Sequence, residues 1–118
     1  MKILFADDSR LIRERIVPFL EELGYEVDAV EDGQELLDRL EAVPDRFDLI
    51  ITDNNMPRLT GLEILRRLKA GARFRQLPIV VYSAGDSIKS LVELLGGRFV
   101  DKTGSIEDLI AVIGELAK

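Results

Sequence analysis

The sequence contains no cysteine, no histidine and no tryptophan. Without cysteine, the chain forms no disulfide bond and offers no thiolate to a metal ion. Without histidine, it lacks the most common general base and the most common zinc ligand. Any chemistry that this chain performs must therefore use groups such as carboxylate, hydroxyl, amide or amine groups.

Long apolar runs and an excess of positive charge are also missing. No apolar run approaches the roughly 18 residues that a membrane-spanning helix needs, and the N-terminus, MKILFADDSR, has too few apolar residues before its aspartates to be a secretory signal. We therefore expect a cytoplasmic chain without membrane insertion. The net charge of −6 argues against direct binding of nucleic acid, which requires a basic face. The basic segment 66–75 is interpreted as a solvated helix end, with a docking patch as the alternative.

The chain has the size and composition of one ordinary globular domain, which we expect to span residues 1–118. Short apolar runs alternate with amphipathic stretches. The predicted strands are residues 3–6, 25–30, 48–52, 78–83 and 98–100. A helix is predicted after each strand, with the N-caps Ser9, Asp32, Thr60, Asp86 and Ser105.

The apolar faces of two of these helices are specific predictions. In the first helix, the residues expected to face the core are Ile12, Ile16, Phe19, Leu20 and Leu23, and Pro18 predicts a kink. In the fourth helix, they are Ile88, Leu91, Val92 and Leu95, and the helix should end at Gly96 and Gly97.

Five strand–helix repeats predict an α/β fold with a parallel sheet and helices on both faces. Strands that are buried on both faces are continuous apolar runs, whereas edge strands can alternate or be short. The second predicted strand alternates and the fifth is short, so these two should form the edges. The flavodoxin-like, doubly wound (βα)5 arrangement with strand order 2-1-3-4-5 satisfies this requirement.

Polar side chains gather at the carboxyl ends of the predicted strands, where sheets of this kind bind ligands. The first strand ends at Asp7 and Asp8, the third at Asp53, the fourth at Ser83 and the fifth at Lys102. Neighbouring carboxylates repel one another unless a cation lies among them, and an all-oxygen site suits Mg²⁺. A lysine and a hydroxyl suit a phosphoryl group. The set predicts phosphoryl transfer to Asp53 as the nucleophile.

Each of these residues also has an ordinary structural explanation when it is taken alone. Adjacent aspartates favour the start of a helix, Asp53 fits a turn, and Lys102 fits a solvated surface. One site explains all the positions together, and we prefer it for that reason. A flavodoxin would need a phosphate loop rich in Ser, Thr and Gly where this chain has ADDSRL. A haloacid-dehalogenase-type phosphatase would place its nucleophile after the first strand in the pattern D-x-D.

The piece DDS follows the first predicted strand, DNNMPRLTG follows the third, YSA lies at the end of the fourth and DK follows the fifth. In this respect the whole chain resembles a receiver domain of the two-component response regulators. The resemblance implies that Asp53 accepts a phosphoryl group from a sensor histidine kinase or a histidine phosphotransfer protein. The chain would then be a conformational switch that controls a downstream partner, and not a turnover enzyme.

The resemblance also implies roles for the other residues of the site. The implied Mg²⁺ ligands are the carboxylates of Asp8 and Asp53, the backbone carbonyl of Asn55 and, through water, Asp7. The implied phosphoryl contacts are the hydroxyl of Ser83 and the amine of Lys102. Phe99 is the implied switch aromatic, which turns inward when Ser83 moves toward the phosphoryl group.

Three features depart from the family pattern. Thr103 follows Lys102 where the family usually has proline, the stretch from Ser83 to Lys102 is shorter by roughly one helical turn, and Pro18 lies in the first helix. The second departure leaves the output surface open, together with the alternative of a pseudo-receiver that signals without phosphorylation. The sequence is equally compatible with a stand-alone regulator, a phosphorelay intermediate and part of a longer protein.

Overall fold

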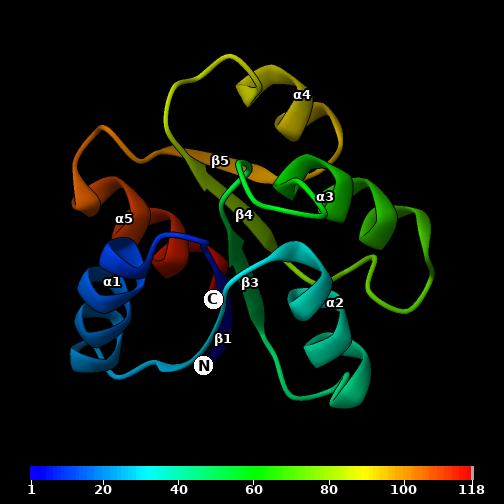
Figure 1. Ribbon diagram of the computed structural model, residues 1–118, viewed down its shortest axis with the longest axis horizontal. Coiled ribbons are helices and arrows are strands. Elements are labelled where there is room, and N and C mark those ends of the chain that lie inside the picture. The colour runs from blue at the N-terminus through cyan, green and yellow to red at the C-terminus, as the bar shows by residue number, and fades with distance from the viewer. Residues whose placement is uncertain (118) are drawn as a thin grey trace.

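The computed structural model describes residues 1–117, which form a five-stranded parallel sheet with helices on both faces (Figure 1). The strand order is β2-β1-β3-β4-β5, so the predicted order 2-1-3-4-5 is confirmed. The elements are β1 (Lys2–Ala6), α1 (Arg10–Glu22), β2 (Glu26–Val30), α2 (Gly33–Ala42), β3 (Leu49–Thr52), α3 (Gly61–Ala70), β4 (Ile79–Ser83), α4 (Lys89–Leu94), β5 (Arg98–Asp101) and α5 (Ile106–Leu116).

The sheet separates two hydrophobic cores. Helices α1 and α5 cover one face, and α2, α3 and α4 cover the other (Figure 1). Side chains alternate along each strand, so Ile3 and Phe5 of β1 enter the first core while Leu4 and Ala6 enter the second. Strands β3 and β4 are buried along their whole length, as expected for strands that are covered on both faces. The three inner strands of the sheet are thus β1, β3 and β4, and β2 and β5 form its edges.

Four of the five predicted N-caps are confirmed. The side chains of Ser9, Asp32, Thr60 and Ser105 each accept a backbone N–H from the first turn of their helix. Thr60 forms a complete capping box, because the side chain of Glu63 also accepts the N–H of Thr60. These caps fix the points at which the loops above the sheet turn into helices.

The prediction that Asp86 caps the fourth helix is wrong. Helix α4 begins at Lys89, its N-cap residue is Ile88, and no side chain caps it. Asp86 contributes only its backbone carbonyl, which accepts the N–H of Lys89 at 3.0 Å. The residues that would form the first helical turn are used instead in the turn that leaves β4. With six residues, α4 is the shortest helix in the described part of the chain.

The predicted apolar face of α1 is too wide. Ile16 and Leu20 are buried, but Phe19 is 36% exposed and Leu23 is 47% exposed. Successive residues are turned by about 100° around a helix, so the i, i+4 pair can face the sheet while Phe19 points sideways. Leu23 follows the last helical residue as the C-cap. The helix runs through Pro18 as one continuous element.

The buried face of α4 is also narrower than predicted, since Val92 is buried whereas Leu91 is 40% exposed. The helix ends as predicted at the glycine pair, where Gly96 has a φ of 92°, a conformation that favours glycine. A Cβ atom on Gly97 would lie 2.9 Å from the Leu65 side chain and 3.1 Å from that of Val92. The glycine pair therefore lets the short helix pack closely over α3.

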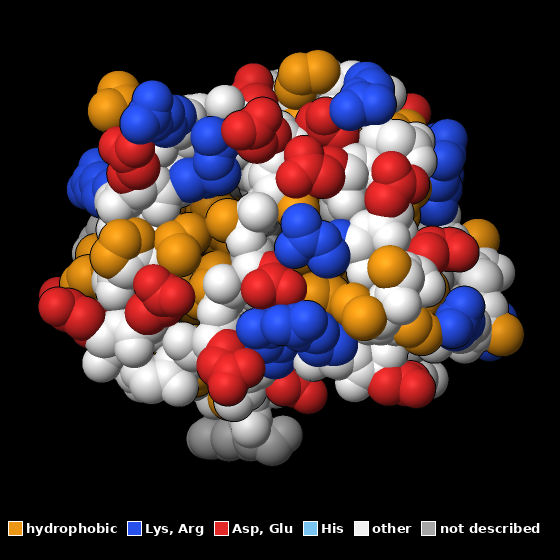
Figure 2. Space-filling view, turned by 60° about the horizontal axis from the view of Figure 1, so that its bottom comes forward, with side chains coloured by type: hydrophobic (Ala, Val, Ile, Leu, Met, Phe, Trp, Pro, Cys, Tyr) orange, Lys and Arg blue, Asp and Glu red, His pale blue; other side chains and the backbone are white. Residues whose placement is uncertain are grey.

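The surface carries charge of both signs. On the face shown in Figure 2, Lys and Arg side chains lie between Asp and Glu side chains, and small hydrophobic areas separate them. None of the helices in residues 1–117 has the length and apolar character needed to cross a lipid bilayer.

Candidate functional site

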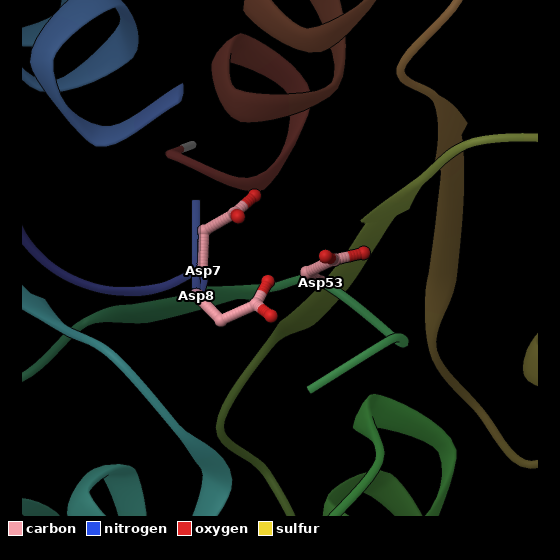
Figure 3. Close-up of side chains that lie close together, drawn as sticks. All are labelled: Asp7, Asp8 and Asp53. Carbon is pink, nitrogen blue, oxygen red and sulfur yellow. The ribbon is translucent and has the colours of Figure 1, made fainter. Parts of the chain in front are cut away.

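The sheet register brings two of the predicted acidic positions together. Ala6 of β1 pairs with Thr52 of β3, so the next residues, Asp7 and Asp53, leave adjacent strands at the same height. The N–H of Asp53 continues the ladder and donates to the carbonyl of Ala6 at 2.9 Å. Asp8 follows directly, and all three side chains extend to one side of the strand ends (Figure 3).

The carboxylates of Asp7, Asp8 and Asp53 form one cluster, with one oxygen from each lying within 4.8 Å of the others. Asp7 is 1% exposed and Asp53 is 7% exposed, whereas Asp8 is open to solvent. The cluster therefore has a buried base and an open mouth through which a small ligand can enter.

Lys102 reaches this cluster from β5. Its Nζ lies 2.6 Å from Oδ2 of Asp7 and 3.3 Å from Oδ2 of Asp53. The backbone N–H of Lys102 donates to the carbonyl of Ser83 at 2.9 Å, and this bond extends the β4–β5 ladder by one residue. The amine thus lies against the two buried carboxylates.

The charges of the cluster do not balance. Three carboxylates and one ammonium leave a net charge of −2 at a largely buried position. All the donors are oxygen atoms, which is the chemistry that a hard divalent cation such as Mg²⁺ requires. The donor set and its charge therefore fit Mg²⁺.

The environment of Asp7 shows the cost of this arrangement. Its Oδ1 accepts the N–H of Ser9 at 2.9 Å and its Oδ2 accepts from Lys102. Burial nevertheless raises the pKa of Asp7 above its usual range, since removal from water outweighs the hydrogen bonds from Lys102 and Ser9, and the charge of Asp53 adds to the effect. A cation in the cluster would relieve this penalty.

The loop after β3 holds Asp53 in place through its backbone. Oδ1 of Asp53 accepts the N–H of Asn54 at 2.8 Å. Asn54 in turn accepts two N–H groups from the start of α3, that of Gly61 on its carbonyl at 3.2 Å and that of Leu62 on its side chain at 3.0 Å. Asn55 is exposed in this loop, two residues after Asp53.

Ser83 and Phe99 lie on the two strands that complete the site. Ser83 ends β4, is 2% exposed and pairs with Asp101 of β5. Phe99 is half-buried and packs against the core beneath α2, α3 and α4. It also lines a cavity of about 300 Å³, together with Asp86 and Lys89.

Two residues without a role in the predicted site, Tyr82 and Asp101, contact Lys102 or the loop that contains it. The Lys102 amine lies 5.7 Å from the ring centre of Tyr82, within the range of a cation–π interaction. The carboxylate of Asp101 accepts the backbone N–H and the hydroxyl of Thr103, the residue that follows Lys102. The pattern Asp-x-Thr at the end of a strand is a signal for such a turn, because both side chains can bond the local backbone.

Comparison with known sequences identifies one family that matches almost the whole chain. The model of the response regulator receiver domain matches residues 3–114. Response regulator MprA of Mycolicibacterium vanbaalenii is 37% identical over 114 residues, covering 94% of this chain and 48% of that protein. MprA of Mycobacterium leprae is 36% identical over 121 residues, covering 100% of this chain and 51% of that protein. The chain thus spans about half the length of the curated relatives it matches.

Solved structures agree with the sequence matches. Chemotaxis response regulator CheY4 of Vibrio cholerae has a TM-score of 0.85 at 30% identity, and the match covers 98% of this chain and 97% of that one. Response regulator TrrA of Thermotoga maritima, in complex with Mg²⁺-BeF, has a TM-score of 0.87 at 29% identity, with the same coverage. The chain belongs to the response regulator receiver domain family of two-component signalling.

Proposed function

We propose that Asp53 accepts a phosphoryl group in a Mg²⁺-dependent reaction. The donor is a phosphohistidine on a sensor histidine kinase or a histidine phosphotransfer protein in the cytoplasm. The acyl phosphate shifts residues 1–118, acting as one domain, between two conformations that a downstream partner distinguishes. The chain is then a phosphoacceptor switch that catalyses only its own phosphorylation and dephosphorylation.

One observation carries this proposal. The carboxylates of Asp7, Asp8 and Asp53 meet within 4.8 Å, and the Lys102 amine lies 3.3 Å from Asp53. A surplus of two negative charges around a nearly buried carboxylate is costly unless a cation offsets it. Thermotoga maritima TrrA, a relative of the same fold, is known in complex with Mg²⁺-BeF.

The transfer step requires no base from this chain. An oxygen of the Asp53 carboxylate attacks phosphorus, an O–P bond forms, and the P–N bond to the histidine ring breaks with its electron pair left on nitrogen. If the ring is protonated on its other nitrogen beforehand, it leaves as neutral imidazole. The absence of histidine from the chain is consistent with this chemistry.

The neighbouring residues position and neutralise the transferred group. Asp8, Asp53 and the carbonyl of Asn55 would hold Mg²⁺, with Asp7 bound through water. When bound, the ion would offset the negative charge of the phosphoryl oxygens. The Lys102 amine would pair with one of these oxygens, and the Ser83 hydroxyl would donate to another. The movement of Ser83 would then be passed to Phe99 as the switch aromatic.

The proposal is tested by intact mass after incubation with acetyl phosphate, in Mg²⁺ and in EDTA. We expect one phosphoryl group per chain with Mg²⁺ and none with EDTA. Borohydride reduces an acyl phosphate to an alcohol, so peptide mapping of the reduced sample should find homoserine at position 53. An adduct on another residue, or one that forms equally well in EDTA, would contradict the assignment.

The pseudo-receiver alternative predicts a different result. A folded sample that takes no phosphoryl group from acetyl phosphate should be offered a phosphorylated histidine protein. Failure with both donors would exclude phosphorylation and make the chain an interaction module.

A substitution of Lys102 separates the roles of the two cations. Because the ammonium competes with Mg²⁺ for Asp7 and Asp53, we expect Lys102→Gln to bind Mg²⁺ roughly fivefold more tightly than the original chain. The same variant should be phosphorylated more slowly, because the phosphoryl oxygens lose their lysine. Calorimetric titration with MgCl₂ measures the affinity, and Lys89→Gln, on exposed α4, is the matched control. Unchanged or weaker Mg²⁺ binding would show that the amine does not compete.

A further inference from the structure

The carboxylate of Asp101 joins the loop that contains Lys102 to the loop that follows β4. Oδ1 of Asp101, the last residue of β5, accepts the N–H of Thr103 at 2.9 Å and the hydroxyl of Thr103 at 2.7 Å. The same oxygen accepts the N–H of Gly85 at 3.3 Å. Gly85 lies in the loop between β4 and α4, and Thr103 lies in the loop between β5 and α5.

These hydrogen bonds bracket the residue that supplies the positive charge of the site. Lys102 lies between Asp101 and Thr103, and its N–H is bound to the carbonyl of Ser83 at 2.9 Å. A lysine side chain has a flexible four-carbon stem, so the direction of its backbone decides whether the amine reaches Asp7 and Asp53. Fixing the backbone on both sides of Lys102 reduces the conformational freedom that the amine must lose.

We propose that Asp101 is a positioning residue, whose carboxylate holds the Lys102 backbone so that the amine lies among the acidic residues of the site. It does the work of the proline that usually follows this lysine in the family and that Thr103 replaces here. The effect on phosphorylation rests on the function proposed above, whereas the effect on the Lys102 side chain does not.

The charge state of Asp101 supports this role. Its pKa lies below the usual range, chiefly because the Thr103 hydroxyl donates to it, with further help from the N–H groups of Thr103 and Gly85. The carboxylate is therefore ionised at neutral pH and is a strong acceptor for all three donors. The hydrogen bond from Gly85 also connects Asp101 to the loop after β4, in which Gly85 lies two residues after Ser83.

The test compares Asp101→Ala with Asp101→Asn and with Asp86→Ala. The alanine variant loses the acceptor, and the asparagine variant keeps a side-chain oxygen in the same place. Asp86→Ala makes the same change of charge at an exposed residue, which lines the cavity beside Phe99 together with Asp101. Each variant is assayed for the rate of phosphorylation at saturating acetyl phosphate and Mg²⁺, for Mg²⁺ affinity and for melting temperature.

We expect Asp101→Ala to lower the saturated rate on the order of tenfold, because the lysine amine is no longer held in position. The asparagine variant should recover part of this loss, and Asp86→Ala should match the original chain. Mg²⁺ affinity should rise in Asp101→Ala, by less than the fivefold expected for Lys102→Gln, because a displaced amine competes less for Asp7 and Asp53. In Asp86→Ala it should stay within about twofold. A wild-type rate in Asp101→Ala, an equal loss in Asp86→Ala, or no recovery in Asp101→Asn would overturn the proposal.

A second readout does not depend on phosphorylation. The ε-CH₂ resonances of Lys102 in NMR spectra report the environment of its amine between the Tyr82 ring and Asp7. We expect them to move toward free-lysine positions in Asp101→Ala and to stay unchanged in Asp86→Ala. If the original chain takes no phosphoryl group, the proposed function fails, and this spectrum alone decides the role of Asp101. Unmoved resonances would refute that role in either case.

Discussion

Replacing Asp53 with asparagine should abolish the phosphoryl adduct completely. The amide nitrogen and oxygen have almost the shape of the carboxylate, so the fold and the hydrogen bond to the N–H of Asn54 can be kept. A neutral amide is no nucleophile toward phosphorus, and Asp7 is a poor substitute because its two oxygens are bound to Lys102 and Ser9. We expect no mass increase with acetyl phosphate and Mg²⁺ under conditions that modify the original chain.

The same variant should also bind Mg²⁺ more weakly, on the order of tenfold, because one of the carboxylates is lost from the cluster. Asp45→Asn is the matched control, since Asp45 is exposed in the turn between α2 and β3. Mass spectrometry and calorimetry on both variants provide the comparison. An adduct that persists in Asp53→Asn would move the nucleophile to another residue and would end the assignment of Asp53.

Replacing Gly61 with alanine should damage both the fold and the site. Gly61 is the first residue of α3, and a Cβ atom there would lie 2.5 Å from the carbonyl oxygen of Asp53 and 3.1 Å from the Cα of Asn54. Neither backbone atom can move without shifting the loop that carries Asp53. We expect a loss of about 3 kcal/mol in the free energy of unfolding, at the upper end of overpacking effects.

Gly114→Ala is the control for this substitution. Gly114 lies in the last turns of α5, and within residues 1–117 no atom outside the adjacent helix backbone lies within 4 Å of an added Cβ. Alanine there should stabilise the chain by about 0.5–1 kcal/mol, because glycine is a poor helix former. Urea unfolding measures both changes, and they should have opposite signs. If Gly61→Ala were as stable as the original chain, the close approach of α3 to the strand end would be wrong.

Much of the fold follows from local features that the sequence displays directly. Continuous apolar runs in the sequence predicted β1, β3 and β4 as the inner strands, and the alternation in residues 25–30 predicted an edge. The predicted strand order also placed Asp7 and Asp53 side by side, because the order of strands in a parallel sheet fixes which carboxyl ends are neighbours.

The errors arise where the outcome depends on packing between elements. Periodicity located the buried face of α1 but not its width, so Phe19 and Leu23 were placed in the core although they are exposed. The start of α4 depends on where the turn after β4 ends, which the local sequence does not show. The prediction of Asp86 as the N-cap is wrong for this reason, since the helix begins at Lys89. The bond between Asp101 and Gly85 joins two loops and has no local signature.

The contact between Lys102 and Asp7 joins residues that are 95 positions apart in the chain. Strands β3 and β4 lie between the strands that carry them, so the contact exists only when the sheet is complete from β1 to β5. During synthesis, Asp53 is made before Lys102, so a chain whose β5 is still in the ribosome lacks the amine beside the carboxylate cluster. The negative charge of the cluster is therefore partly neutralised only once β5 has joined the sheet.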